Sequence, residues 1–305
     1  MEEMERYKHL NKYLKEKFGE RTLKICIDGG FTCPNRDGVK GIGGCIFCSE
    51  KGSGEHINTA NNISEQVKNY FSSYKAKRAN KFIVYFQNFT NTYDSIENLK
   101  VKYDSALIDD RIVGISIATR PDCINEDIAK FLKSYSDKYY VSVELGLQTA
   151  NEETGKLINR CYTNQDFTNA VNILNVYNID IITHIMVGLP NETDQDIKNT
   201  VDFLNNHNIQ GLKIHSCYVV KNTKLEDLYN TGKYTPLELD YYLETCAYIL
   251  THINPNIIIH RISGDAPKDL LVVPSWNIHK KWIINGMDKL LREKNLWQGM
   301  YFNKI

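Results

Sequence analysis

The sequence predicts an α/β fold built on a parallel sheet. Short runs rich in β-branched residues alternate with segments whose apolar residues recur three and four positions apart. The repeat of about 30 residues is that of β-α units. Such alternation favours a parallel sheet, either doubly wound or closed into a barrel. A length of 305 residues suits one such domain.

The predicted strands are apolar almost throughout, as expected of strands that are buried on both faces. They span residues 23–27, 81–86, 112–118, 140–147, 180–188 and 211–217, and a seventh is expected over 256–262. Helices are predicted between them over 62–77, 125–135, 164–177 and 193–207, each beginning near a residue that commonly caps helices. In the first helix, Val67, Tyr70, Phe71 and Tyr74 are expected on one face.

Charge and hydropathy exclude several classes of protein. The 37 basic and 37 acidic residues give no net charge, so the protein has no global field that would attract a polyanion. Two basic segments, 74–81 and 280–294, are either solvated helix faces or local phosphate-binding faces. The N-terminus has no signal-peptide pattern and no run of 18 apolar residues occurs, so a cytoplasmic protein is expected.

Three cysteines follow the first predicted strand within one glycine-rich stretch. The sequence CPNRDGVKGIGGCIFC holds Cys33, Cys45 and Cys48. In a parallel α/β fold this stretch lies at the carboxyl ends of the strands, where active sites form. Zinc usually takes four ligands in paired knuckles, and a fourth ligand such as His56 has no standard spacing here. A redox CxxC pair would not need Cys33. Three thiolates on a [4Fe–4S] cluster that keeps one iron open fit the pattern better.

The remaining five cysteines are scattered along the chain and are expected to be buried or incidental thiols. They are Cys26, Cys123, Cys161, Cys217 and Cys246.

The motifs of the whole chain, in order, resemble one family. The blocks are GGFTCPNRDGVKGIGGCIFC, YFQNFTNTY, ATRPDC, ELGLQTA, INRCYT, HIMVGLPNET, GLKIHSCYVVKNT and HRISGDAP. They resemble the radical S-adenosylmethionine (SAM) superfamily. The spacing Cys33-x11-Cys45-x2-Cys48 departs from the commonest CxxxCxxC form and matches the YtqA/YhcC family, which is similar to the radical-SAM domain of Elp3.

This resemblance implies a fold and two cofactors. The fold is a partial (β/α)6 TIM-like barrel over residues 23–262, with helical extensions over 1–22 and 263–305. Cys33, Cys45 and Cys48 would bind the [4Fe–4S] cluster. SAM would chelate the open iron, and its reductive cleavage would give a 5′-deoxyadenosyl radical that abstracts a substrate hydrogen atom.

The resemblance also implies site residues. Phe47, Asn88, Thr90, Glu144, Gln148, Arg160 and Gly188 are expected to contact SAM, with Asn88 and Thr90 at its amino group and Arg160 paired with its carboxylate. His184, His215 and Arg261 are expected to face the substrate. From the residues alone, Glu144 or Arg160 could equally well belong to a structural ion pair, and a lone histidine on a strand is more often a core residue.

The Elp3-like resemblance points to tRNA as the substrate, at the C5 side chain of a wobble uridine. The chain lacks the acetyltransferase domain of Elp3, so making a carboxymethyl group is not expected. The hypothesis is removal of the carboxymethyl group from 5-carboxymethylaminomethyl-uridine, which leaves 5-aminomethyl-uridine. The alternatives are a radical SAM enzyme for a small metabolite or porphyrin-like compound, and a zinc-binding adaptor without catalysis. Flavodoxin or ferredoxin is the expected electron donor, and no membrane partner is expected.

Overall fold

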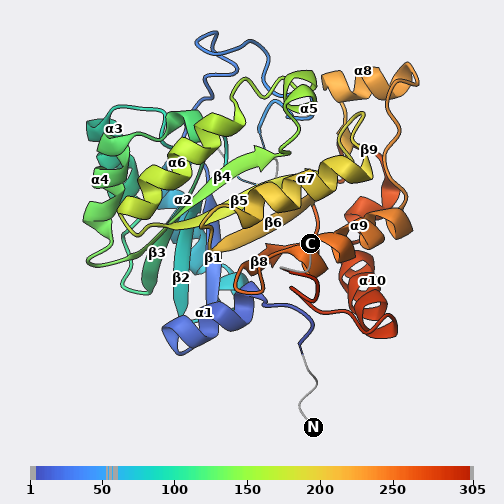
Figure 1. The fold of residues 1–305 in the computed structure, drawn as a ribbon. Coiled ribbons are helices and arrows are strands. Elements are labelled where there is room, and N and C mark those ends of the chain that lie inside the picture. The colour runs from blue at the N-terminus through green and yellow to red at the C-terminus, as the bar shows by residue number, and fades with distance from the viewer. Residues whose placement is uncertain (1–4, 53, 55–56, 58–60, 303–305) are drawn as a thin grey trace.

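A computed structural model describes residues 5–52, 54, 57 and 61–302 and confirms the α/β fold. Seven parallel strands form one sheet that curls into a partial barrel, in the order β1-β2-β3-β4-β5-β6-β8 (Figure 1). The strands are β1 (Thr22–Ile27), β2 (Lys81–Phe86), β3 (Ile112–Thr119), β4 (Tyr140–Gln148), β5 (Asp180–Val187), β6 (Gly211–Ser216) and β8 (Ile258–Arg261). All seven predicted strands are therefore present.

Helices cover the outer face of the sheet (Figure 1). They are α2 (Ile63–Ser72), α3 (Ile96–Asp104), α4 (Glu126–Tyr135), α6 (Asn164–Val176), α7 (Asp194–Asn205) and α9 (Leu239–His252). Five of these helices begin at a side chain that accepts a hydrogen bond from a backbone N–H of the first turn, and four of the five were predicted, α3 being the exception. These caps are Asn62, Ser95, Asn125, Thr163 and Thr193.

The first predicted helix is shorter than expected. Helix α2 ends at Ser72 because Ser73 adopts an extended conformation, and the short 3-10 helix η1 (Tyr74–Arg78) follows. Val67 is buried as predicted, whereas Tyr74 lies outside the helix and is 77% exposed. The prediction that Tyr74 shares the buried face was wrong.

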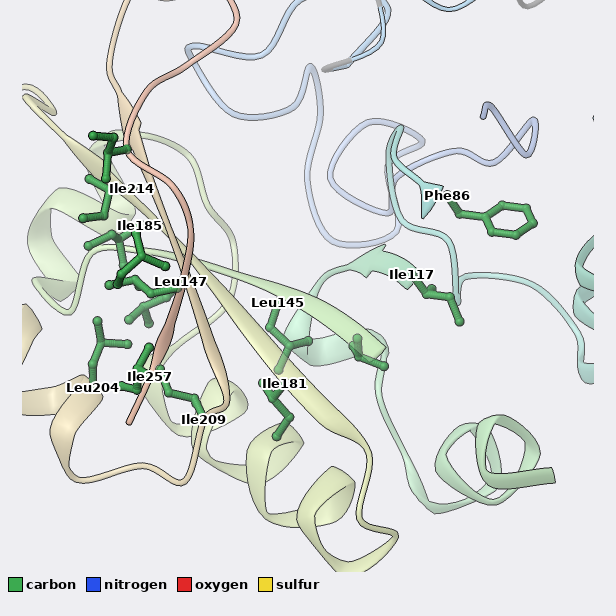
Figure 2. Close-up of a cluster of buried hydrophobic side chains, with 14 of the residues drawn as sticks. Phe86, Ile117, Leu145, Leu147, Ile181, Ile185, Leu204, Ile209, Ile214 and Ile257 are labelled. Atoms are coloured by element: carbon green, nitrogen blue, oxygen red, sulfur yellow. The ribbon is translucent and has the colours of Figure 1, made fainter. Parts of the chain in front are cut away.

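Successive side chains along each strand point alternately to the outer and the inner face of the sheet. Residues such as Phe86, Ile117, Leu145 and Ile181 point outward and pack with helix residues such as Leu204 in one hydrophobic cluster (Figure 2). The intervening residues point to the concave inner face. Many of these are polar: Lys24, Tyr85, Ser116, Ser142, Glu144, His184, Lys213 and His215. The prediction that the strands are apolar on both faces was wrong for the inner face.

Terminal segments complete the domain. Helix α1 (Leu10–Phe18) contacts both edge strands, β1 and β8, and the backbone just before it pairs with β8, where Ile259 N–H donates to the carbonyl of Lys8 at 2.8 Å. The segment after residue 262 is not purely helical, because β9 (Leu271–Val273) pairs with β7 (Val219–Val220). The 3-10 helix η3 (Ser275–Ile278) and helix α10 (Lys280–Glu293) follow, and α10 packs on α9.

Candidate active site

The cysteine loop lies at the carboxyl ends of the strands, beside helices α5 (Glu152–Leu157) and α8 (Lys224–Asn230) (Figure 1). Ile46 joins it to both helices. Its N–H donates to the carbonyl of Ile158 at 3.1 Å, and its carbonyl accepts from the N–H of Leu225 at 2.9 Å. The ends of α5 and α8 therefore hold the cysteine loop in place through Ile46.

Glycine and asparagine shape this loop. Gly43 and Gly44 have φ angles of 80° and 78°, a backbone conformation that favours glycine. A Cβ atom at Gly41 would lie 2.2 Å from the side-chain oxygen of Asn35. Asn35 is fully buried, and its NH2 group donates to the carbonyl of Asn159 at 2.6 Å and to the sulfur of Cys45 at 3.6 Å. The packing thus fixes the position of the Cys45 thiol.

The three predicted thiols lie near one another in this loop, since those of Cys33 and Cys48 both act on the charge of Cys45. Burial raises the pKa of Cys45 to about 12, and the neighbouring thiols of Cys48 and Cys33 also raise it. Among the described residues, no group of three His, Cys, Asp or Glu side chains could hold a metal ion. His56, a candidate zinc ligand, lies outside those residues. Thiols that are neighbours without converging on a single metal ion suit a cluster whose irons each take a separate cysteine.

Polar groups after β2 and β1 border the cysteine loop. Asn88 is buried and donates to the Asp28 carboxylate at 3.0 Å. The side-chain oxygens of Asn88 and Thr90 are buried and accept no hydrogen bond from the part of the chain that the structure describes. Buried oxygens of this kind normally have a partner, so a ligand that donates hydrogen bonds fits here. The sequence analysis missed Asp28, whose position directly after β1 was the available signal.

Gln148, Gly188 and Phe47 also lie near the carboxyl ends of the strands. The hydroxyl of Tyr162 hydrogen-bonds to the side-chain oxygen of Gln148. Gly188 has φ +90° and its carbonyl accepts from the hydroxyl of Tyr234 at 2.8 Å, whereas Phe47 packs partly buried against the neighbouring apolar cluster. Their contact with SAM stays a prediction.

Arg160 has a different environment from the one expected. Its guanidinium is fully buried and all five of its N–H donors are used. The acceptors are the carbonyls of Leu147, Thr149 and Tyr162 at 2.8, 2.7 and 3.0 Å and the side chains of Glu152 and Asn164 at 3.0 and 3.2 Å. Arg160 therefore braces the loop after β4, and no donor remains for a SAM carboxylate.

Glu144 lies in the middle of the inner face, at the centre of a charged group. Its carboxylate pairs with Lys24 at 2.6 Å, with Lys213, and with the Nε2 atom of His184 at 2.7 Å, and it accepts from Ser116 at 3.0 Å. Burial alone would raise the pKa of Glu144, but the charges of Lys213 and Lys24 hold it well below its usual range. The carboxylate is thus fully engaged. The sequence analysis missed both lysines.

The three residues expected to face the substrate differ in their surroundings. Burial lowers the pKa of His184 to about 4, so the ring is neutral and its Nε2–H donates to Glu144. The His215 ring lies 5.1 Å from the His184 ring, and its Nε2 atom is buried without a partner among the described residues. Arg261 pairs with Asp265 at 2.6 Å.

The two basic segments also differ. Lys75, Lys77 and Arg78 are exposed on η1. In contrast, four of the five basic residues of 280–294 pair with acids: Lys280 with Asp265, Lys289 with Glu293, Arg292 with Asp288 and Lys294 with Glu244. The segment 280–294 is therefore a weak candidate for phosphate contacts.

Comparison with known families settles the class. The sequence profile of the radical SAM superfamily matches residues 33–204, which include all three loop cysteines, and that of the Radical_SAM C-terminal domain matches residues 209–293. The chain belongs to the radical SAM superfamily. As a radical SAM protein it is an enzyme by class, and the superfamily implies a [4Fe–4S] cluster and SAM.

Relatives of this radical SAM chain are found in bacteria and archaea. It is 38% identical to the Bacillus subtilis protein YtqA, over 98% of this chain and 94% of YtqA. It is 31% identical to Escherichia coli YhcC, over 92% of this chain and 90% of YhcC. A tRNA uridine(34) acetyltransferase of Dehalococcoides mccartyi is 30% identical over 57% of the chain and 37% of that protein.

The solved structure of Methanocaldococcus infernus Elp3 shares this fold. The TM-score is 0.69 at 17% identity, over 91% of this chain and 64% of that one. The likeness confirms the predicted partial barrel. No helix within the described ranges is long and apolar enough to cross a membrane.

Proposed function

We propose that this radical SAM enzyme removes the carboxymethyl group from 5-carboxymethylaminomethyl-uridine at the wobble position of tRNA and leaves 5-aminomethyl-uridine. The observation that carries the proposal is the proximity of Cys33, Cys45 and Cys48 within one loop at the rim of a polar inner face. Similarity to a tRNA uridine(34) acetyltransferase supports the choice of substrate. Such a substrate places the protein in the cytoplasm.

The residues of the rim have distinct roles in this proposal. Cys33, Cys45 and Cys48 would hold the cluster and leave one iron open for SAM. The side-chain oxygens of Asn88 and Thr90, which lack partners among the described residues, would accept hydrogen bonds from SAM. Further SAM contacts would come from Gln148, Gly188 and Phe47. When bound, the two cofactors supply a radical that removes a hydrogen atom from the substrate.

The inner face would receive the modified base. A wobble uridine lies in a single-stranded loop and can be splayed into a protein pocket. His184, His215 and Arg261 would orient its side chain below the radical source. The exposed basic residues of η1 would contact phosphates, and a flavodoxin or ferredoxin would supply the electron.

Nucleoside mass analysis of tRNA from a deletion strain tests this proposal. We expect 5-carboxymethylaminomethyl-uridine to accumulate and the aminomethyl form and its derivatives to disappear, and the wild-type gene to restore them. An unchanged wobble-uridine profile would contradict the proposal and direct attention to small-molecule substrates.

A further inference from the structure

The inner face carries surplus positive charge at one place. Two ammonium groups, those of Lys24 and Lys213, share the single carboxylate of Glu144, and the neighbouring His184 ring is neutral. Burial lowers the pKa of Lys213 to about 8, and repulsion from Lys24 and Arg261 adds to this effect. Buried charges are normally balanced, so this group has room for one more anion.

Each ammonium group also has an unused donor. Lys213 hydrogen-bonds to Glu144 and to the hydroxyl of Tyr85 at 3.3 Å, and Lys24 hydrogen-bonds to Glu144 and to Ser116 at 3.2 Å. An ammonium group has three N–H donors, so one remains on each within the described part of the chain. The two nitrogens bind the two oxygens of the same Glu144 carboxylate and are therefore close to one another. They also lie near the Tyr85 ring, that of Lys24 at 4.9 Å and that of Lys213 at 4.4 Å from its centre.

The charged group is open to a ligand. The side chains of Lys24 and His184 are 16% and 20% exposed to solvent, although Glu144 between them is fully buried. His215 follows Lys213 by two residues on the same strand and face, one step nearer the cysteine loop. Its Nε2 atom is buried without a partner among the described residues, and its ring lies 5.1 Å from that of His184. A polar ligand between the loop and the lysines would satisfy this nitrogen.

We infer that Lys213 and Lys24 bind a carboxylate of the substrate on the inner face of the sheet, while His215 contacts the same side chain. The inference rests on the proposed function, because the carboxymethyl group of the modified uridine ends in a carboxylate. The two ammonium groups can each donate to that carboxylate and remain paired with Glu144. The site then selects a free acid and rejects an ester, which carries no charge to balance the lysines.

Equilibrium binding tests the inference without turnover. The probes are two anticodon stem-loop RNAs, one with 5-carboxymethylaminomethyl-uridine at the wobble position and one with its methyl ester, added to unreduced holoenzyme with SAM. Wild-type protein should bind the acid about 10-fold to 100-fold more tightly than the ester. Lys213→Met should lose this preference, whereas the control Lys100→Met, whose side chain is exposed on α3, should keep it.

The outcomes separate the two proposals. Equal affinity of wild-type protein for acid and ester would overturn the carboxylate site, and so would an unchanged preference in Lys213→Met. If Lys213→Met does not fold, the wild-type comparison still decides. Turnover of the acid RNA without any preference for it leaves the proposed function standing and removes this inference alone. If the acid RNA is neither bound nor converted by reduced wild-type enzyme, the proposed function itself fails.

Discussion

Replacement of Arg160 by methionine tests the role that the structure gives this residue. The guanidinium donates to three backbone carbonyls and two side chains around the loop after β4. Methionine has a similar length but no donor, so Arg160→Met leaves the three carbonyls without these hydrogen bonds in a buried environment.

The expected cost follows from these contacts. An unsatisfied buried polar group costs roughly 1–3 kcal/mol, so three carbonyls give at least about 3 kcal/mol. The loss of Glu152 as a partner adds little, because its side chain is 40% exposed and water can solvate the freed carboxylate. At roughly 2 °C per kcal/mol, the melting temperature should fall by at least about 6 °C.

Thermal unfolding of the cofactor-free protein, followed by circular dichroism, measures this loss. The matched control is Arg78→Met, because Arg78 is exposed on η1 and its replacement should change stability by less than about 1 kcal/mol. If Arg160 instead binds the SAM carboxylate, Arg160→Met would keep the wild-type melting temperature and lose SAM affinity. That result would refute the structural role.

Three further changes have expected outcomes. Cys45→Ala should abolish bound iron and all SAM cleavage, whereas Cys246→Ala, in the core, should do neither; equal iron in wild type and Cys45→Ala would contradict the ligand assignment. Glu144→Gln should destabilise the fold by about 3–5 kcal/mol in urea unfolding, because two buried ammonium groups lose their carboxylate, whereas Glu153→Gln on the surface should cost less than about 1 kcal/mol. The kcat/KM for the acid RNA should fall as pH rises through about 8, because Lys213 then loses the proton and charge that hold the substrate; a flat profile between about pH 7 and pH 10 would contradict this.

Local patterns explain what the sequence predicts well. Strand positions, helix caps and the cysteine loop depend on residues close together in the chain, such as Thr193 at the start of α7 or the three cysteines within 33–48. The end of α2 at Ser72 was missed because nothing in the segment 72–75 excludes a helix, whereas the extended Ser73 leads the chain into η1 before β2.

Long-range pairing explains what the sequence does not predict. Lys24, Glu144 and Lys213 lie on three different strands, and only the register of the sheet brings them together. A lysine in the middle of an apolar strand was the available signal, because burying a lone ammonium is costly without a partner. Arg160 was mispredicted although its acceptors are near it in the sequence. These carbonyls surround the guanidinium only because of the path of the loop after β4, which the sequence does not reveal.

The most direct test of the central claim is an anaerobic assay with reconstituted enzyme, dithionite, SAM and tRNA from a strain that lacks this gene. The measured quantities are 5′-deoxyadenosine and the wobble nucleosides after digestion. We predict that deoxyadenosine formation rises with tRNA and that 5-carboxymethylaminomethyl-uridine is converted to 5-aminomethyl-uridine. Deoxyadenosine formed at the same rate with and without tRNA, with no nucleoside changed in mass, would contradict the tRNA assignment and leave only the radical SAM chemistry.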